Sequence, residues 1–206
     1  YPKINGLVDK FNKNGVSTFL VTNAQFPEDI KRLGKVTQLY ISLDAPEKIL
    51  LKEIDNPLFE DYWERLLKSL DYLSEKKQRT CIRLTLIKDY NMENPEKYAE
   101  LIKRGNPDFL EFKSYMHVGA SIKRLNRSSM PMMDEVEKFT KEVLSFLPDY
   151  EIVTDHKPSF VIMLAKKKFF KEGKWNTWID FKKYDELVNS GKEFGTEDYL
   201  ALTPKI

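Results

Sequence analysis

Short apolar segments alternate with longer segments of helical periodicity along this chain, and this alternation limits its fold more than any other feature. Two strands, Thr18–Val21 and Leu39–Ile41, contain apolar residues without polar alternation. Such strands are typical of a parallel sheet that helices cover on both faces. The link between them, which includes Pro27–Ile30, has room for one short crossover helix. The segment therefore predicts a βαβ unit, which is a building block of α/β folds.

The same alternation continues downstream. Apolar residues at helical spacing predict a helix over 4–11 and a long helix that opens at Pro57, where a missing N–H costs little. The buried stripe expected for the long helix consists of Leu58, Tyr62, Leu66, Leu70 and Leu73. Two further strands are expected at Thr80–Ile87 and Phe109–Lys113, with a helix between them that starts at Asn94 and Pro95. The sequence thus predicts an α/β fold with parallel strands.

The last third of the chain follows a different pattern. A helix is expected from Val136 to Leu147, followed by strands at Tyr150–Thr154 and Phe160–Lys166. The short link between these strands is typical of a hairpin, so this pair is expected to be antiparallel. The aromatic tail from Gly173 is expected to pack back over the domain. Its tryptophans, Trp175 and Trp178, are interpreted as core or lid residues, because large aromatic side chains mostly pack.

Polar residues follow the first two strands at the point where each ends. Thr22 and Asn23 follow one strand, and Ser42 and Asp44 follow the next. In parallel sheets ligands bind at the carboxyl ends of strands, so these side chains are candidates for a binding site. They are equally explained as caps and turns, where such residues are common for local reasons.

Two cations lie within apolar strands, and their burial needs an explanation. Arg83 and Lys113 each have apolar neighbours, and a buried cation is costly unless it is paired. Each is therefore expected to face a ligand or water, or to pair with a carboxylate such as Glu111 or Asp44. The single cysteine, Cys81, is expected to be a small buried residue.

Composition excludes several classes of function. The 206 residues fit one domain or most of a larger one, and 41% hydrophobic content supports a packed core. The net charge of +2 implies no strong global field. No apolar run reaches membrane-spanning length, so we expect no membrane partner and a cytoplasmic location. The chain has one cysteine and two histidines, His117 and His156, which lie in different segments without the spacing of metal ligands. We therefore expect no metal ligand in this chain.

Several segments resemble the radical S-adenosylmethionine family. Thr22-Asn23 resembles the tip of the third strand of that family, and Ser42–Ala45 the tip of the fourth. Ile82–Ile87, with Asn91 shortly after, resembles the fifth. Further segments resemble the members that make 4-demethylwyosine for wybutosine in tRNA: Phe19–Pro27, Gln38–Ala45, Gln78–Thr80 with Arg83–Leu86, Gly105–Phe109, Lys113–Gly119, Trp175–Asp180 and Asp198–Pro204. The last three of these are specific to those members.

This resemblance implies a fold and its parts. It implies a partial (β/α)6 radical-SAM barrel that lacks its first two strands and carries a C-terminal β-hairpin and a helical extension. Residues 1–147 would form the C-terminal part of the barrel, and residues 148–206 would form a family-specific extension packed on it. A barrel without its first strands exposes an apolar edge near Leu20, so we expect the chain alone to be marginally stable or to self-associate.

The chain also departs from the family. It contains no Cys-x-x-x-Cys-x-x-Cys loop, which in the family ligates a [4Fe-4S] cluster, and no Gly-Glu-Pro turn after a second strand. We therefore expect the chain to be the C-terminal part of a catalytic domain, with the cluster cysteines outside it. The resemblance also implies an electron donor, such as a flavodoxin-like protein or an upstream domain that carries FMN.

The resemblance implies a specific reaction for the full enzyme, a radical carbon–carbon lyase. S-Adenosylmethionine yields a 5′-deoxyadenosyl radical that abstracts hydrogen from pyruvate, and the pyruvate radical adds to N1-methylguanosine beside the anticodon of phenylalanine tRNA. Loss of the carboxyl carbon of pyruvate and ring closure then give the tricyclic 4-demethylwyosine base. Two alternatives remain open. In the first alternative, the chain is an inactive tRNA-binding remnant. In the second, it is part of another radical enzyme that acts on a small substrate.

The resemblance also implies residue roles. Residues expected to contact S-adenosylmethionine are Thr22, Asn23, Ser42, Asp44, Arg83 and Asn91; among them, Arg83 would hold carboxylate or ribose oxygens and Asn91 would lie near the adenine. Residues expected on the side of the tRNA base are Lys113, Tyr115 and His117. The long loop over 114–133 contributes cations expected at tRNA phosphates, unless they are simply solvated: Lys123, Arg124 and Arg127.

Overall fold

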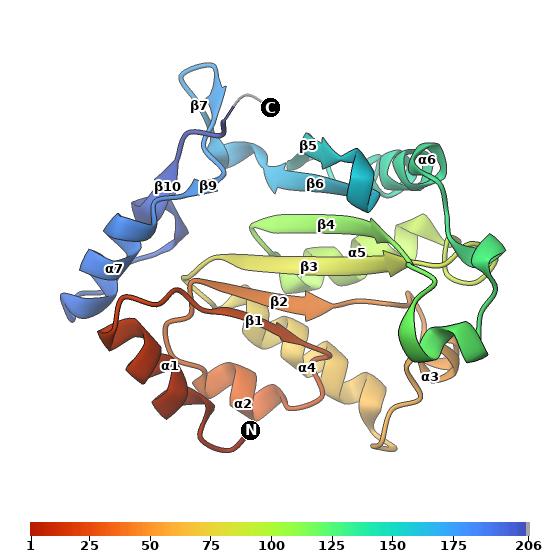
Figure 1. Cartoon of the computed structure of the whole chain (residues 1–206), viewed down its shortest axis with the longest axis horizontal. Coiled ribbons are helices and arrows are strands. Elements are labelled where there is room, and N and C mark those ends of the chain that lie inside the picture. Colours follow the sequence, from red (N-terminus) through yellow and green to blue (C-terminus); the bar gives the residue numbers. More distant parts are fainter. Residues whose placement is uncertain (205–206) are drawn as a thin grey trace.

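A six-stranded sheet with helices against one face forms the body of the protein (Figure 1). The computed structural model describes residues 1–204. The sheet has the order β1-β2-β3-β4-β6-β5. Its strands are β1 (Phe19–Thr22), β2 (Gln38–Ser42), β3 (Thr80–Leu86), β4 (Phe109–Ser114), β5 (Tyr150–His156) and β6 (Val161–Lys166). The first four strands pair in parallel, and β6 pairs antiparallel with both β4 and β5.

Helices connect the parallel strands, as the sequence pattern predicts. These connecting helices are α2 (Pro27–Arg32), α3 (Lys48–Asp55), α4 (Tyr62–Ser74) and α5 (Pro95–Gly105). Helix α1 (Ile4–Lys13) precedes β1, and α6 (Met133–Leu144) lies between β4 and β5. The buried face of the sheet contributes Ile41, Ile82 and Leu84 to the main core, where they pack with helix residues such as Leu70 and Ile102. Among the described residues, no helix is long and apolar enough to cross a membrane.

Two expectations about the first half of the chain were wrong. Leu58 is 96% exposed, because α4 begins only at Tyr62. A separate helix, α3, precedes it and ends where Asn56 adopts a left-handed conformation. The prediction that both faces of the first two strands are covered also fails, because helices lie against only one face of the sheet (Figure 1). β1 is moreover an edge strand, and its Phe19 and Val21 are about half exposed on the open face. A run of apolar residues does not show whether a strand is packed on both faces or lies at the edge of the sheet with one face open.

The C-terminal segment lies at the amino ends of the parallel strands, opposite their tips (Figure 1). It contains β9 (Trp178–Ile179), α7 (Phe181–Asn189) and β10 (Leu200–Ala201), after a small hairpin of β7 (Phe170–Lys171) and β8 (Lys174–Trp175). β9 and β10 pair antiparallel in a two-stranded sheet of their own. The aromatic tail packs against the domain through Tyr184 and Tyr199, which are buried. Trp178 and Phe181 are about half exposed, so Trp178 is not a core residue.

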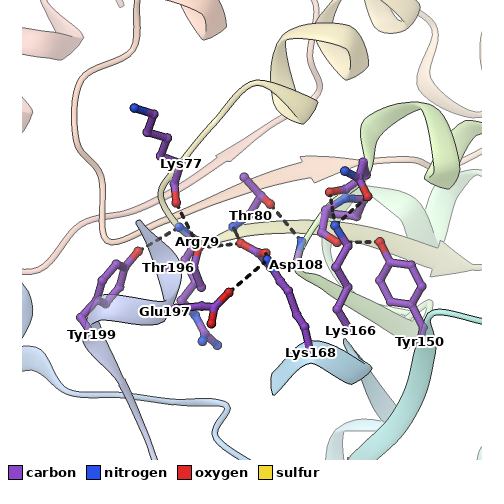
Figure 2. Close-up of polar contacts among 12 residues, drawn as sticks. Lys77, Arg79, Thr80, Asp108, Tyr150, Lys166, Lys168, Thr196, Glu197 and Tyr199 are labelled. Carbon is purple, nitrogen blue, oxygen red and sulfur yellow. Dashed lines mark hydrogen bonds and ion pairs between the residues drawn. The ribbon is translucent and has the colours of Figure 1, made fainter. Parts of the chain in front are cut away.

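A polar cluster fastens this segment to the sheet (Figure 2). The buried carboxylate of Asp108 accepts a hydrogen bond from the Thr196 hydroxyl at 2.6 Å and an ion pair from Lys168 at 3.2 Å. The Tyr199 hydroxyl donates to the Thr37 carbonyl at 3.0 Å and accepts from the Arg79 backbone N–H at 2.8 Å. The three hydrogen bonds join residues 88 or more positions apart in the chain, so they fix where the tail lies.

Candidate functional site

The face of the sheet opposite the helices carries a row of polar side chains. Parallel pairing sets Ser42 beside Arg83, and Arg83 beside Glu111. Residues in register on neighbouring strands point to the same face, so these three side chains share one surface. Two positions further along, Thr85 and Lys113 form the next row toward the strand tips. We refer to this surface as the polar face.

Arg83 is the centre of the polar face. Its guanidinium donates to the Glu111 carboxylate from Nε at 3.1 Å and from Nη2 at 3.0 Å, and it lies 4.7 Å from the centroid of the Tyr40 ring. Burial lowers the pKa of Arg83, but the attraction of Glu111 outweighs it and the pKa is raised. The alternative that Arg83 pairs with Glu111 is therefore confirmed. The pair keeps a partly exposed side on the open surface, with 27% of the Arg83 side chain accessible.

The residues predicted for the side of the tRNA base lie at the end of β4. Tyr115 is buried, and its backbone N–H donates to the Leu86 carbonyl at 2.8 Å, which ties the segment to the tip of β3. Its hydroxyl lies 3.1 Å from Nδ1 of His117 and donates to Ser121 at 2.9 Å. Tyr115 therefore fixes the orientation of the His117 imidazole. Lys113 precedes them on the polar face.

Asp44 and Asn91 form a layer behind the strand tips. Asp44 accepts the Thr85 backbone N–H at 3.2 Å, and burial raises the pKa of its carboxyl. Asn91 is 1% exposed, and its amide donates to the Asp44 and Thr85 carbonyls at 2.8 Å each. Its side-chain oxygen accepts the Ile87 N–H. The structure thus gives Asn91 a positioning role between two strands, because its side-chain polar groups are bonded within the chain.

The tip of β1 is arranged differently from the tip of β2. Thr22 pairs in register with Ile41, which belongs to the core under the helices, so Thr22 points away from the polar face. Its hydroxyl accepts the Ala24 N–H at 3.1 Å. This is the local turn explanation that the sequence left open. Asn23 is exposed beyond the strand end.

The three loop cations do not behave alike. The Arg124 guanidinium donates to the Glu53 and Ile54 carbonyls at 3.0 and 3.1 Å, so it caps the last turn of α3. Lys123 and Arg127 are exposed, and no ion pair involves either within residues 1–204. Of the three cations, Lys123 and Arg127 therefore have positive charges available for a polyanion.

The described residues do not fit an iron–sulfur cluster. Within residues 1–204, no group of three or more histidine, cysteine, aspartate or glutamate side chains could hold a metal ion. Cys81 is 2% exposed and burial raises the pKa of its thiol well above the usual value, as expected for an inert buried residue.

Sequence reasoning missed one part of the surface. A cavity of about 310 Å³ lies between the polar face and the C-terminal segment, and Arg79, Gln38 and Tyr40 line it. The available signal was weak: Arg79 is a cation directly before an apolar strand, which is also where solvated lysines and arginines commonly lie. Only the packing of the tail turns Arg79 into a buried residue.

Two families match the chain. The family described as "Radical SAM superfamily" matches residues 1–102, and the family described as "Wyosine base formation" matches residues 104–166. The chain is 45% identical to the mouse S-adenosyl-L-methionine-dependent tRNA 4-demethylwyosine synthase and 47% identical to the rice protein. These alignments cover 100% and 99% of the chain but 29% and 32% of the relatives, so the chain spans about a third of their length.

Two solved structures of TYW1 superpose on this chain. A structure described as TYW1 with a lysine–pyruvate adduct bound superposes with a TM-score of 0.74 at 39% identity. An archaeal TYW1 crystal structure superposes with a TM-score of 0.67 at 35% identity. Each comparison covers 82% of this chain and 53% of the solved one.

Proposed function

The chain belongs to the radical S-adenosylmethionine proteins of wyosine base formation, and from this membership we propose that it works as part of a tRNA 4-demethylwyosine synthase. Its fold is the partial radical-SAM barrel of that family, as the sequence predicts. In the proposed reaction, pyruvate condenses with N1-methylguanosine of phenylalanine tRNA in the cytoplasm. Residues 1–147 supply one wall of the reaction chamber, and residues 148–206 extend and close it.

S-Adenosylmethionine bound at a reduced cluster would supply the radical that starts the reaction. We assign the polar face to that ligand and to the substrates. Ser42 offers a hydroxyl, and Arg83 offers the donors that Glu111 leaves unused, which suits carboxylate or ribose oxygens. Asp44 and Asn91 hold the two strand tips together, while Asn23 lies at the rim.

The base and the tRNA backbone take the other end of the face. Lys113 offers an ammonium to the carboxylate of pyruvate. Tyr115 contacts Nδ1 of His117, which orients the imidazole and leaves Nε2 for proton transfer. Lys123 and Arg127 meet tRNA phosphates, which need exposed cations without exact geometry. Electrons come from a flavodoxin-like donor, which in longer relatives would carry FMN.

One observation carries this proposal. The identity of 45% to a 4-demethylwyosine synthase extends over the whole chain, including the strands that build the polar face. A member of the superfamily with an unrelated substrate would retain the strand tips, but it would not match the wyosine base formation family over residues 104–166.

Mass spectrometry of tRNA tests the proposal. The native protein that contains this chain is expressed in cells that lack their own synthase, and nucleosides from phenylalanine tRNA are analysed. We expect 4-demethylwyosine to appear and N1-methylguanosine to decrease. Accumulation of N1-methylguanosine alone, with the protein present at normal level, would favour the inactive tRNA-binding remnant.

A further inference from the structure

A short hairpin after the sheet concentrates positive charge. It comprises residues 166–175, from the last residue of β6 through β7 and β8, and we refer to it as the basic hairpin. Five of its ten residues are lysines and one is a glutamate, whereas the whole chain has a net charge of only +2. The rest of the chain is therefore net negative. Figure 1 shows the hairpin projecting beyond the sheet, so its tip is free to meet a partner.

The turn of the basic hairpin holds two lysines directly opposite each other. Glu172 and Gly173 have positive φ angles of 53° and 74°, which a tight two-residue hairpin turn requires. In the register of the two strands, Lys171 pairs with Lys174. Like charges in directly opposed positions destabilise a strand pair, so an anion bound beside them would relieve a cost that the chain alone carries.

Two lysines at the base of the hairpin hold it on the domain. Lys166 donates to the Asn106 carbonyl at 2.8 Å. Lys168 forms an ion pair with the buried carboxylate of Asp108 at 3.2 Å (Figure 2). These two cations are committed to contacts within the chain, so the hairpin has a fixed place before any partner binds.

The other three lysines present their charge to solvent. Lys167 and Lys174 are exposed, and neither forms an ion pair within residues 1–204. Lys171 pairs with Glu197 at 2.6 Å, but 51% of its side chain remains exposed. A polyanion can therefore contact all three ammonium groups from the solvent side.

An exposed aromatic ring lies among these charges. Phe170 is 50% exposed, and its ring centroid lies 5.2 Å from that of Trp175. Bases of any sequence stack on such rings, while cations follow the phosphate backbone. An acidic protein would account for the lysines alone, whereas lysines combined with an exposed ring favour a nucleic acid.

We propose that the basic hairpin is a second contact with tRNA, at which Lys167, Lys171 and Lys174 bind backbone phosphates and Phe170 stacks on a nucleotide. The inference rests on the proposed function and adds a contact with the same substrate. It is distinct from the cations of the 114–133 loop, which lie toward the strand tips beside the proposed site of the base.

The hairpin lies on the side of the sheet that carries the polar face. Trp175 and Phe169 belong to one apolar cluster with Phe109 of β4. Phe109 and Glu111 are two residues apart on that strand, so they point to the same side of the sheet. The hairpin and the 114–133 loop lie at opposite ends of the strands, which are about 20 Å long. One tRNA molecule spans that distance, so both regions can contact it at once.

Binding of phenylalanine tRNA to the native protein at several salt concentrations tests the hairpin. The variant Lys167→Gln/Lys174→Gln removes two charges that form no ion pair in the described chain. We expect its affinity to fall about fivefold or more, and the slope of log affinity against log salt to become less steep by about 1.5–2. The matched control is Lys103→Gln/Lys138→Gln, at exposed lysines of α5 and α6, which should bind as the wild type does.

Two further measurements separate the phosphate contacts from stacking. The lysine variant should lose the same affinity for an unrelated tRNA, because phosphate contacts carry no sequence information. Phe170→Ser should weaken binding by about fivefold or more and leave the salt slope unchanged, because stacking neutralises no phosphate. A wild-type salt slope in the lysine variant would overturn the proposal.

Stability and kinetics separate tRNA binding from other roles. The melting temperature of the lysine variant should stay the same or rise, because the variant relieves the opposed charges. Its KM for tRNA should increase at unchanged kcat, because the hairpin does not touch the reacting atoms. Loss of kcat at unchanged tRNA affinity would assign the hairpin to an acidic electron donor and overturn the proposal.

The proposed function is tested separately. If the wild type forms 4-demethylwyosine while the lysine variant keeps the wild-type salt slope, only the hairpin contact is refuted. If the wild type forms none but binds tRNA through the hairpin, only the proposed function is refuted.

Discussion

Arg83 and Glu111 decide how much positive charge the polar face presents to a ligand. Their two hydrogen bonds use Nε and Nη2 of the guanidinium and leave one edge toward the open surface. The sequence could predict that Arg83 needs a carboxylate, because a cation in an apolar strand is costly. It could not choose between Glu111 and Asp44, since that choice depends on strand register. Arg79 lies in a segment that resembles the family, but its burial could not be predicted, because its contact Tyr199 follows it by more than a hundred residues.

Glu111→Gln should destabilise the protein by about 1–3 kcal/mol, because it leaves a half-buried guanidinium without its counter-charge. Chemical denaturation at neutral pH measures the free energy of unfolding. Glu60→Gln, at an exposed position, serves as the control and should change stability by less than about 0.5 kcal/mol. Equal stability of the two variants would contradict the role assigned to the ion pair.

Asp44 should make stability depend on pH. Burial raises the pKa of its carboxyl in the folded state above the usual value, so the unfolded state releases this proton more easily. The contribution of this group to stability is full below about pH 4 and is lost as pH rises through the folded pKa. Asp44→Asn keeps the acceptor for Thr85 and should therefore flatten the decline in stability above about pH 4. If the melting temperature of Asp44→Asn depended on pH in the same way as that of the wild type, the proposed effect of the Asp44 carboxyl would be refuted.

Among the helices and strands, apolar periodicity predicted the elements whose position depends mainly on the local sequence. Most helices and strands of the first half appear where apolar spacing places them, and the β5–β6 hairpin is antiparallel as expected. The errors lie where context decides. The short helix α3 was missed because its apolar residues, Leu50 and Leu51, read as part of a connection. The direction of Thr22 follows from the register with Ile41, which no local pattern records.

Helix α5 packs closely on the sheet through Gly105. A Cβ at this position would lie 3.0 Å from Ile82 Cδ1 and 3.1 Å from Leu70 Cδ2. We expect Gly105→Ala to cost about 1–3 kcal/mol of unfolding free energy through overpacking. Gly6→Ala is the matched control on α1, where nothing lies within 4 Å, and it should gain about 0.5–1 kcal/mol. A stabilised Gly105→Ala variant would show that the core yields easily there.

For the whole molecule, the exposed apolar edge of the sheet at β1 is the feature that matters most. β1 is the parallel edge of the sheet, and Phe19 and Val21 are about half exposed on the open face. The other end continues past residue 147 into β6 and β5, so the antiparallel hairpin extends the same sheet. The family resemblance supplied this architecture and the reaction, whereas periodicity alone supplied only the α/β class.

The 206-residue chain should self-associate through β1. Unpaired backbone groups and apolar side chains at a sheet edge form a template for pairing with a second copy. We expect the weight-average mass from light scattering to increase with concentration, and Val21→Lys to reduce this increase. Val118→Lys, at a position 64% exposed and outside the sheet, should not. A monomer at all concentrations would refute the prediction.

The most direct measurement is the amount of 4-demethylwyosine in phenylalanine tRNA when Lys113 is changed within the native protein. Lys113→Met keeps the volume of the side chain and removes its charge from the polar face, whereas Lys103→Met changes an exposed lysine of α5. We expect Lys113→Met to abolish the modified base at unchanged protein level, and Lys103→Met to leave it normal. A normal amount of 4-demethylwyosine with Lys113→Met would contradict the assignment of the polar face as the reaction chamber.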